Sequence, residues 1–355
     1  MAIGSVRAQL HLFLMRARSR LLSVLAPLLT GRVTARALST SPTTLDPTDW
    51  SSLRASAHAL LDASFDKMEN AKEGRVWTPP PDSLKQELQE SLPVDGMDVD
   101  QVSARLKALL PYGVGNTHPR FFGWVHGSGS PSGVLAEMVA VAMNANCGGR
   151  DHAAIYVEKQ VLSWCRSIMG FPADCGGLLV SGTSMATIVA LKAARDLALD
   201  AATSRKQGLI DAQKARGRLV GYAASGTHSC VAQAFDVLGM GTEALRLVPV
   251  KADFTMDAVQ LDEMIRADVA AGLTPFVIVG TAGSVNVGAI DDLSALADLA
   301  DVHGVWLHVD GAFGACGVLC DEVRPRLSGM ERASSLAFDF HKWMHVNYDC
   351  GYVHA

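Results

Sequence analysis

The sequence lacks the features that mark metal-binding, disulfide-rich and membrane-spanning proteins. Its seven cysteines are scattered and none forms a CxxC pair, so the sequence predicts neither a zinc site nor a disulfide framework. No apolar stretch approaches the roughly 18 to 20 residues that span a bilayer. We therefore expect no metal site and no membrane span. The cysteines are interpreted as small buried side chains in a reducing compartment.

Acidic residues are absent from one end of the chain. The first 45 residues contain six arginines and no Asp, Glu or Lys, whereas the 355-residue chain has a formal net charge of −5, which leaves −11 for the remainder. An acidic body argues against nucleic acid as a partner, because binding to a phosphate backbone requires a basic surface. A small-molecule substrate is the more natural partner.

Residues 1–45 have an unusual composition. The stretch "VRAQLHLFLMRARSRLLSVLAPLLTGRVTARALSTSPTT" combines arginines, leucines and hydroxylated residues, which is typical of an organelle transit peptide. A basic amphipathic surface helix or an unstructured tail would have a similar composition. We expect a transit peptide that directs the protein to the mitochondrion, with a plastid or the cytoplasm as alternatives.

The rest of the chain divides into two patterns. Residues 46–113 show apolar residues at helical spacing and no strand signal, which predicts a helical segment. In residues 114–355, short apolar runs alternate with longer helical ones, a pattern typical of an α/β domain with a mostly parallel, buried sheet. The predicted strands are 176–181, 219–224, 245–250, 276–281, 305–310 and 335–340.

Polar residues follow several of these strands, where ligands of open α/β sheets gather. Thr183 and Ser184 lie where a strand passes into a helix, and small hydroxylated residues there either cap the helix or bind phosphate. His228 follows the second strand, where a cap or a packed side chain is the plainer interpretation. Asp310 ends the fifth strand and is a helix cap, a salt-bridge partner or a carboxylate beside a cationic ring nitrogen.

Lys342 follows the last predicted strand within the apolar stretch "SLAFDFHKWMHV". Such surroundings favour the neutral amine, which is a nucleophile suited to Schiff-base chemistry. A snorkelling or ion-paired lysine is the alternative. A phosphate-binding turn, a histidine, a carboxylate and this lysine together outline a site for pyridoxal 5′-phosphate (PLP).

The order of these motifs resembles one enzyme family. The motif "HVDGAFGACG", followed 32 residues after Asp310 by the lysine of "FDFHKW", resembles the group II PLP-dependent amino-acid decarboxylases, together with "SGTSMATIVAL", "GTHSCVAQAF", "GTAGSVNVGAIDDL" and "HKWMHVNYDCGY". That family includes the aromatic-amino-acid, histidine and glutamate decarboxylases. The resemblance implies a fold-type-I, aspartate-aminotransferase-like large domain, preceded by N-terminal helices, that works as a homodimer.

The resemblance also implies roles for individual residues. Lys342 would carry the cofactor as an internal aldimine, Asp310 would pair with the pyridine nitrogen, and His228 would stack on the ring. The remaining positions implied in cofactor binding are Thr183, Ser184, His341, Thr281 and Asp339. Gly311 stands where many relatives carry Ala, which we interpret as a tolerable loss of one methyl group.

The implied reaction is decarboxylation of an L-amino acid through an external aldimine and a carbanion. Two alternatives remain open: another PLP reaction on the same scaffold, such as aldehyde synthesis, desulfuration or carbon–carbon cleavage, or a chain that only binds PLP or dimerises. The second arises because family members continue past the lysine through a catalytic loop and a smaller C-terminal domain, which the 355 residues do not include. Phe121 or Phe122 could offer an aromatic wall to the pocket, which favours an aromatic substrate, or they could simply be core residues.

Overall fold

The computed structural model describes residues 46–92 and 96–355. The expected transit peptide, residues 1–45, lies outside the described residues. The chain divides into two compact units, the first ending at Phe122 and the second beginning at Gly123, so the boundary expected after residue 113 falls inside the first unit. Among the described helices, none combines the length and apolar character needed to cross a membrane.

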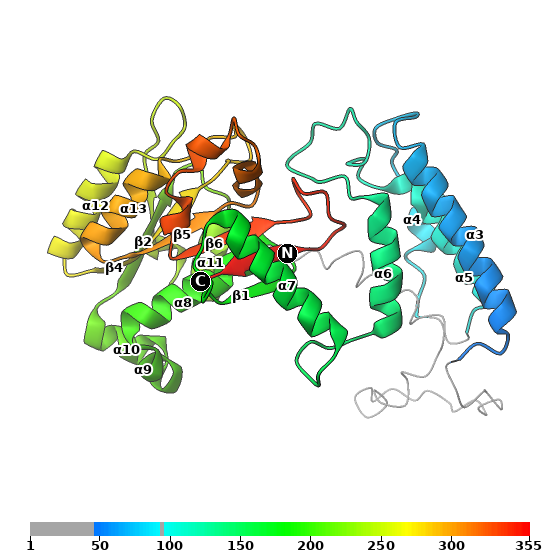
Figure 1. Cartoon of the computed structure of the whole chain (residues 1–355), viewed down its shortest axis with the longest axis horizontal. Helices are drawn as coiled ribbons and strands as arrows, with labels where there is room; N and C mark the ends of the chain where they lie inside the picture. The colour runs from blue at the N-terminus through cyan, green and yellow to red at the C-terminus, as the bar shows by residue number, and fades with distance from the viewer. Residues whose placement is uncertain (1–45, 93–95) are drawn as a thin grey trace. The chain divides into compact units, whose positions relative to one another are not determined.

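The described part of the first unit is helical. It contains α3 (Trp50–Glu69), α4 (Asp82–Glu87), α5 (Val99–Leu109) and the 3-10 turn η2 (Leu110–Tyr112) (Figure 1). Helix α3 begins where Asp49 accepts hydrogen bonds from the N–H groups of Ser51 and Ser52, at 2.8 and 3.2 Å, because these donors have no partner inside the helix. The Ser56 hydroxyl donates to Asp100 at 2.6 Å and links α3 to α5.

The second unit is built on one sheet. In the described residues, seven strands pair in the order β1-β7-β6-β5-β4-β2-β3. Strand β7 pairs antiparallel with both β1 and β6, whereas the other pairs are parallel. The strands are β1 (Gly177–Val180), β2 (Leu219–Ala224), β3 (Leu245–Val248), β4 (Thr274–Thr281), β5 (Trp306–Asp310), β6 (Ser335–Asp339) and β7 (Gly351–His354).

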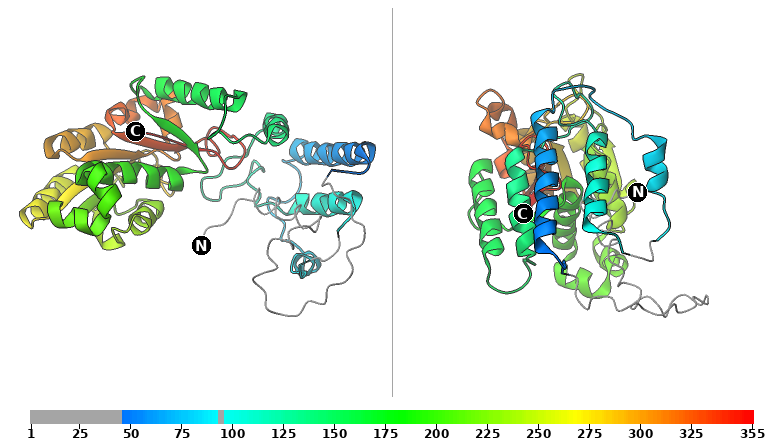
Figure 2. Two further views of the ribbon diagram at one scale, coloured as in Figure 1. Left: turned by 90° about the horizontal axis from the view of Figure 1, so that it is seen from below. Right: turned by 90° about the vertical axis from the view of Figure 1, so that its right-hand side faces the viewer.

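Two of the described helices of this unit precede β1 and the others lie between strands in the sequence, and helices pack on both faces of the sheet. They are α6 (Pro131–Met143), α7 (Ala153–Met169), α8 (Thr183–Leu199), α9 (Ala201–Gln207), α10 (Leu209–Arg216), α11 (Cys230–Val237), α12 (Ala258–Ala270) and α13 (Leu293–His303), with 3-10 turns η3 (Thr242–Ala244), η4 (Ala315–Leu319), η5 (Arg324–Leu327) and η6 (Met330–Arg332). In the left view of Figure 2, α7 and α8 lie on opposite sides of the sheet.

Apolar side chains on the two faces of the sheet pack in separate cores. Ile278 of β4 packs in the core that includes residues of α7, α12 and α13. Its neighbours Val277 and Val279 pack in the core formed with α8, α10 and α11. Successive side chains of a strand point to opposite faces, so a sheet covered on both faces reads in the sequence as a continuous apolar run.

The predicted α/β fold with a mostly parallel sheet is confirmed. All six predicted strands are present, with ends that differ by at most two residues. Strand β7 was not predicted. It lies between β1 and β6 and therefore decides which of the polar turns become neighbours.

Candidate cofactor site

The turn after β1 lies against the turn after β6 because only β7 separates the two strands. Asp339, the last residue of β6, accepts a hydrogen bond from the backbone N–H of Thr183 at 2.7 Å. A β-carbon on Gly182 would lie 3.4 Å from Cε1 of His341, and one on Gly351 would lie 2.5 Å from Cα of Gly182. Glycine in β7 thus allows this close approach of the two backbones.

Lys342 is held by the same carboxylate. Its Nζ lies 2.8 Å from Oδ2 of Asp339. The carboxylate side chain is 3% exposed and that of the lysine 23%, so the pair is mostly shielded from water. The sequence predicted an amine in apolar surroundings, and the structure adds its counter-ion.

His341 is a buried, neutral histidine. Its Nδ1 accepts a hydrogen bond from the backbone N–H of Cys350 at 2.9 Å, which places the ring proton on Nε2, 3.6 Å from Oδ2 of Asp339. Burial lowers the pKa of His341, and the Lys342 charge lowers it further, against the opposing effect of Asp339. The ring stacks on Tyr348 with centroids 4.2 Å apart.

Asp310 ends β5 as a buried carboxylate. Its Oδ1 accepts the backbone N–H of Ala312 at 3.1 Å, and its Oδ2 lies 4.0 Å from the thiol of Cys230. Burial raises the pKa of Asp310, whereas the Ala312 N–H, Lys342 and His228 oppose that rise. A thiol is a weak donor. Oδ2 is therefore the oxygen that a cationic N–H group would stabilise most.

The other predicted residues lie at neighbouring strand ends. Nδ1 of His228 accepts the N–H of Cys230 at 3.2 Å, where α11 begins. The N–H of Thr281 donates to Asp291 at 2.8 Å at the end of β4. Ser184 is exposed in the first turn of α8. The recorded hydrogen bonds and ion pairs join Thr183, Asp339, His341 and Lys342 directly, and they do not join Ser184 or Thr281 to this group.

Several buried hydroxyl groups at these strand ends have no hydrogen-bond partner in the described structure. They belong to Thr183 and Thr187 of α8, to Thr227 after β2 and to Thr281 of β4. An unpaired buried hydroxyl costs free energy, and such groups mark places where a ligand or water completes the bonding.

Two further contacts were not predicted from the sequence. The Cys230 thiol lies beside Asp310, and a single cysteine in a helix carries no signal that separates it from a core residue. The segment 127–133 packs on the loop after Lys342: the N–H of Ser130 donates to Oδ1 of Asn347 at 3.2 Å, and that of Ser128 donates to Nδ1 of His345 at 3.3 Å. The run "HGSGSPSG" was the available signal, since glycines allow such close packing.

The residues present fit PLP. The N-terminus of α8 and the Thr183 hydroxyl are suited to a phosphate group. The Lys342 amine is suited to an aldehyde, and the free side of the Asp310 carboxylate to a protonated ring nitrogen. PLP carries all three of these groups on one ring.

Comparisons with known proteins agree with this assignment. The family model described as the pyridoxal-dependent decarboxylase conserved domain matches residues 81–355. An aromatic-L-amino-acid decarboxylase from Bacillus atrophaeus is 32% identical over 305 residues, which cover 85% of this chain and 61% of that protein. A phenylacetaldehyde synthase from Arabidopsis thaliana is 30% identical over 86% of this chain and 63% of its own length.

Solved structures of related proteins have a fold similar to that of this chain. The structure of Oryza sativa TDC with PLP and tryptamine matches with a TM-score of 0.78 and 29% identity, covering 88% of this chain and 65% of that one. The chain thus spans about three fifths of the length of the curated relatives it matches. The predicted cofactor, pyridoxal 5′-phosphate, is confirmed. The chain belongs to the pyridoxal-dependent decarboxylase family.

Proposed function

We propose that the protein decarboxylates an L-amino acid with PLP as its cofactor. The observation that carries the proposal is the placement of Lys342 and Asp310 at the carboxyl ends of β6 and β5, two neighbouring parallel strands. This arrangement presents an amine and a buried carboxylate on one edge of the sheet. Membership of the decarboxylase family supports the reaction class.

Each residue of the site has a separate task in this reaction. Bound PLP supplies an electron sink for the electron pair that remains when CO2 departs. Asp310 would hold a proton on the ring nitrogen, because its carboxylate is buried and Oδ2 faces only a thiol, which is a weak donor. His228 would pack beside the ring. His341, with its proton on Nε2, would donate a hydrogen bond near the phosphate end.

The proposed substrate is an aromatic L-amino acid. Support comes from the similarity to an aromatic-L-amino-acid decarboxylase. The aromatic wall expected from Phe121 or Phe122 gains no support from Phe122, whose side chain is 94% exposed in the first unit.

The test is product analysis on the PLP-loaded protein with a panel of L-amino acids. We expect release of CO2 with the matching amine, fastest for an aromatic substrate. A Lys342→Ala variant should lose both turnover and the absorbance of the covalently bound cofactor. Turnover that persists without Lys342, or a product other than the amine, would refute the proposal.

Aldehyde synthesis is the second candidate, and the similarity to a phenylacetaldehyde synthase favours it. The two reactions consume the same amino acid and both release CO2, but aldehyde synthesis also releases the nitrogen as ammonia and is a two-electron oxidation that requires O2 as oxidant. They differ in the organic product, which is an amine in one case and an aldehyde in the other. The same panel, analysed for both products, separates them.

We further propose that the protein works as a homodimer. Helix α6 supports this, because apolar side chains of Leu135, Met138, Val139 and Val141 are between 53% and 65% exposed. An apolar surface of this kind favours burial against a partner. In analytical ultracentrifugation, a Leu135→Asp/Val139→Asp variant should sediment as a monomer and the unchanged protein as a dimer.

Mitochondrial import is proposed for residues 1–45. The support is their composition, with six arginines and no acid. A fluorescent protein fused behind these residues should enter mitochondria, and replacing Arg16, Arg18 and Arg20 by Glu should abolish import. Accumulation in plastids or in the cytoplasm would favour the alternative locations.

A further inference from the structure

Asp339 contacts the distant first turn of α8 with one oxygen and the nearby Lys342 amine with the other. Oδ1 accepts the backbone N–H of Thr183 at 2.7 Å, and Oδ2 lies 2.8 Å from Nζ of Lys342. The carboxylate is 3% exposed. Neither contact competes with the other, because each uses a different oxygen.

These contacts join the first turn of α8 to the turn that follows β6. Thr183 opens α8, and the first N–H groups of a helix have no partner inside it. A carboxylate satisfies such a donor and interacts favourably with the positive end of the helix dipole. Lys342 lies three residues beyond Asp339, in the turn that follows β6. A buried carboxylate requires compensation by donors and by an opposite charge, and here it has both.

We propose that Asp339 is a positioning residue that ties the Lys342 amine to the first turn of α8. It thereby fixes the distance between the aldehyde-binding and phosphate-binding ends of the PLP site before the cofactor arrives. This role differs from that of a phosphate ligand, because both oxygens of the carboxylate are already engaged by the protein. The inference rests on the PLP site and does not require that the bound cofactor be turned over.

The two contacts can be separated by mutation. Asp339→Asn retains a carbonyl oxygen that accepts the Thr183 N–H, but it removes the negative charge beside Lys342. Asp339→Ala removes both contacts. Asp349→Asn removes the same charge from an exposed position in the following loop and serves as the matched control.

The first experiment uses the cofactor-free protein. Thermal unfolding is compared for Asp339→Asn, Lys342→Met and the double variant. We expect the melting temperature of the double variant to fall by less than the sum of the falls for the two single variants. Each single variant leaves one member of the pair without its partner. Lys342→Arg should unfold close to the unchanged protein, since it keeps a cation beside Asp339. Additive losses in the cycle would overturn the proposal.

The second experiment measures binding of two probes. PLP carries both an aldehyde and a phosphate, whereas pyridoxine 5′-phosphate carries the phosphate without the aldehyde. For Asp339→Asn we expect the PLP dissociation constant to rise about tenfold, with pyridoxine 5′-phosphate binding nearly unchanged. Asp339→Ala should weaken both, and Asp349→Asn neither. Equal weakening of both probes by Asp339→Asn, or no effect on PLP, would overturn the proposal.

Discussion

Gly311 is packed so closely against Ala315 that the two positions share one small space. A β-carbon on Gly311 would lie 2.5 Å from Cβ of Ala315, 3.0 Å from a methyl of Leu336 and 3.1 Å from the carbonyl oxygen of Ala337. The interpretation of Gly311 as a tolerable loss of one methyl group stays a prediction, and the packing gives it a physical reason. The side chain of Ala315 already occupies the volume that a methyl group on residue 311 would need.

Gly311→Ala should destabilise the protein by about 1–3 kcal/mol, the usual cost of overpacking a tight core. The double variant Gly311→Ala/Ala315→Gly should recover most of that loss, because one methyl group replaces the other. Denaturant unfolding of the three proteins measures this. A double variant that is no more stable than Gly311→Ala would show that the two methyl groups do not compete.

Asp310→Asn should lower turnover about 10²- to 10³-fold, the range seen when a preorganised electrostatic contact is removed from an active site. An amide has no charge with which to hold a proton on the ring nitrogen. Steady-state kinetics on PLP-loaded protein provides the measurement. Asp321→Asn, which removes an exposed carboxylate paired with Arg324, should retain full activity. A decrease in turnover of less than tenfold for Asp310→Asn would show that Asp310 has no catalytic role.

Acid should destabilise the second unit through two buried histidines. Burial lowers the pKa of His308 to about 3 and that of His354 to about 4. Both values lie below the ordinary value near 6.5, so the unfolded chain binds protons first as the pH falls. The contribution of the two neutral histidines to the free energy of unfolding is fully present above pH 6.5 and declines towards pH 4. For His354 alone the decline is on the order of 3 kcal/mol.

His354→Gln removes that titrating group and should flatten the decline in unfolding free energy between pH 6.5 and 4. Exposed His58, changed to Gln, should leave the slope unchanged. Equilibrium unfolding at a series of pH values gives both slopes. Equal slopes for the unchanged protein and His354→Gln would show that His354 does not contribute to the acid sensitivity.

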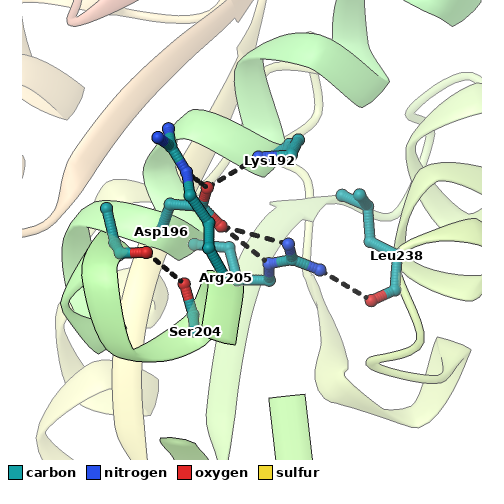
Figure 3. Close-up of polar contacts among 7 residues, drawn as sticks. Lys192, Asp196, Ser204, Arg205 and Leu238 are labelled. Atoms are coloured by element: carbon teal, nitrogen blue, oxygen red, sulfur yellow. Dashed lines mark hydrogen bonds and ion pairs between the residues drawn. The ribbon is translucent and has the colours of Figure 1, made fainter. Parts of the chain in front are cut away.

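A buried carboxylate joins α8 to α9. Asp196, whose side chain is 6% exposed, lies 2.6 Å from Lys192, 3.0 Å from Arg195 and 3.6 Å from Arg205 (Figure 3). Arg195 also donates to the carbonyl oxygen of Leu238 at 3.1 Å. Burial alone would raise the pKa of Asp196, but the hydrogen bonds and charges of Lys192 and Arg195 outweigh it and lower the pKa.

Asp196→Asn should therefore cost about 1–3 kcal/mol, since it leaves hydrogen-bonded cations without their charge partner. Asp211→Asn provides the comparison, because Asp211 pairs with Lys214 at 2.8 Å on the surface, and exposed pairs contribute about 0–1 kcal/mol. Urea unfolding distinguishes the two. Equal costs would mean that burial of Asp196 adds nothing to the pairing.

Much of this fold could be predicted from sequence because each buried strand is a continuous apolar run ended by a polar residue. Asp310 and Asp339 stand at such ends. The alternation of short strands and longer helices then indicates a parallel sheet covered on both faces. Lys342 could be identified because a lysine between apolar residues requires an explanation.

The spatial order of the strands could not be predicted in this way. Strand β7 is four residues long and antiparallel to its neighbours, so it lacks the pattern of the parallel strands. Without it, nothing places Thr183 beside Asp339. The second missing element is the contact between Cys230 and Asp310, which joins residues 80 positions apart and depends wholly on tertiary packing.

The position of β7 has a consequence for biosynthesis. This strand follows the other six in the chain, yet it lies between β1 and β6. The ribosome therefore synthesises both flanking strands before it synthesises β7. Until then, the sides of β1 and β6 that pair with β7 have no partner strand. We therefore expect the two halves of the cofactor site to come together once β7 has been made.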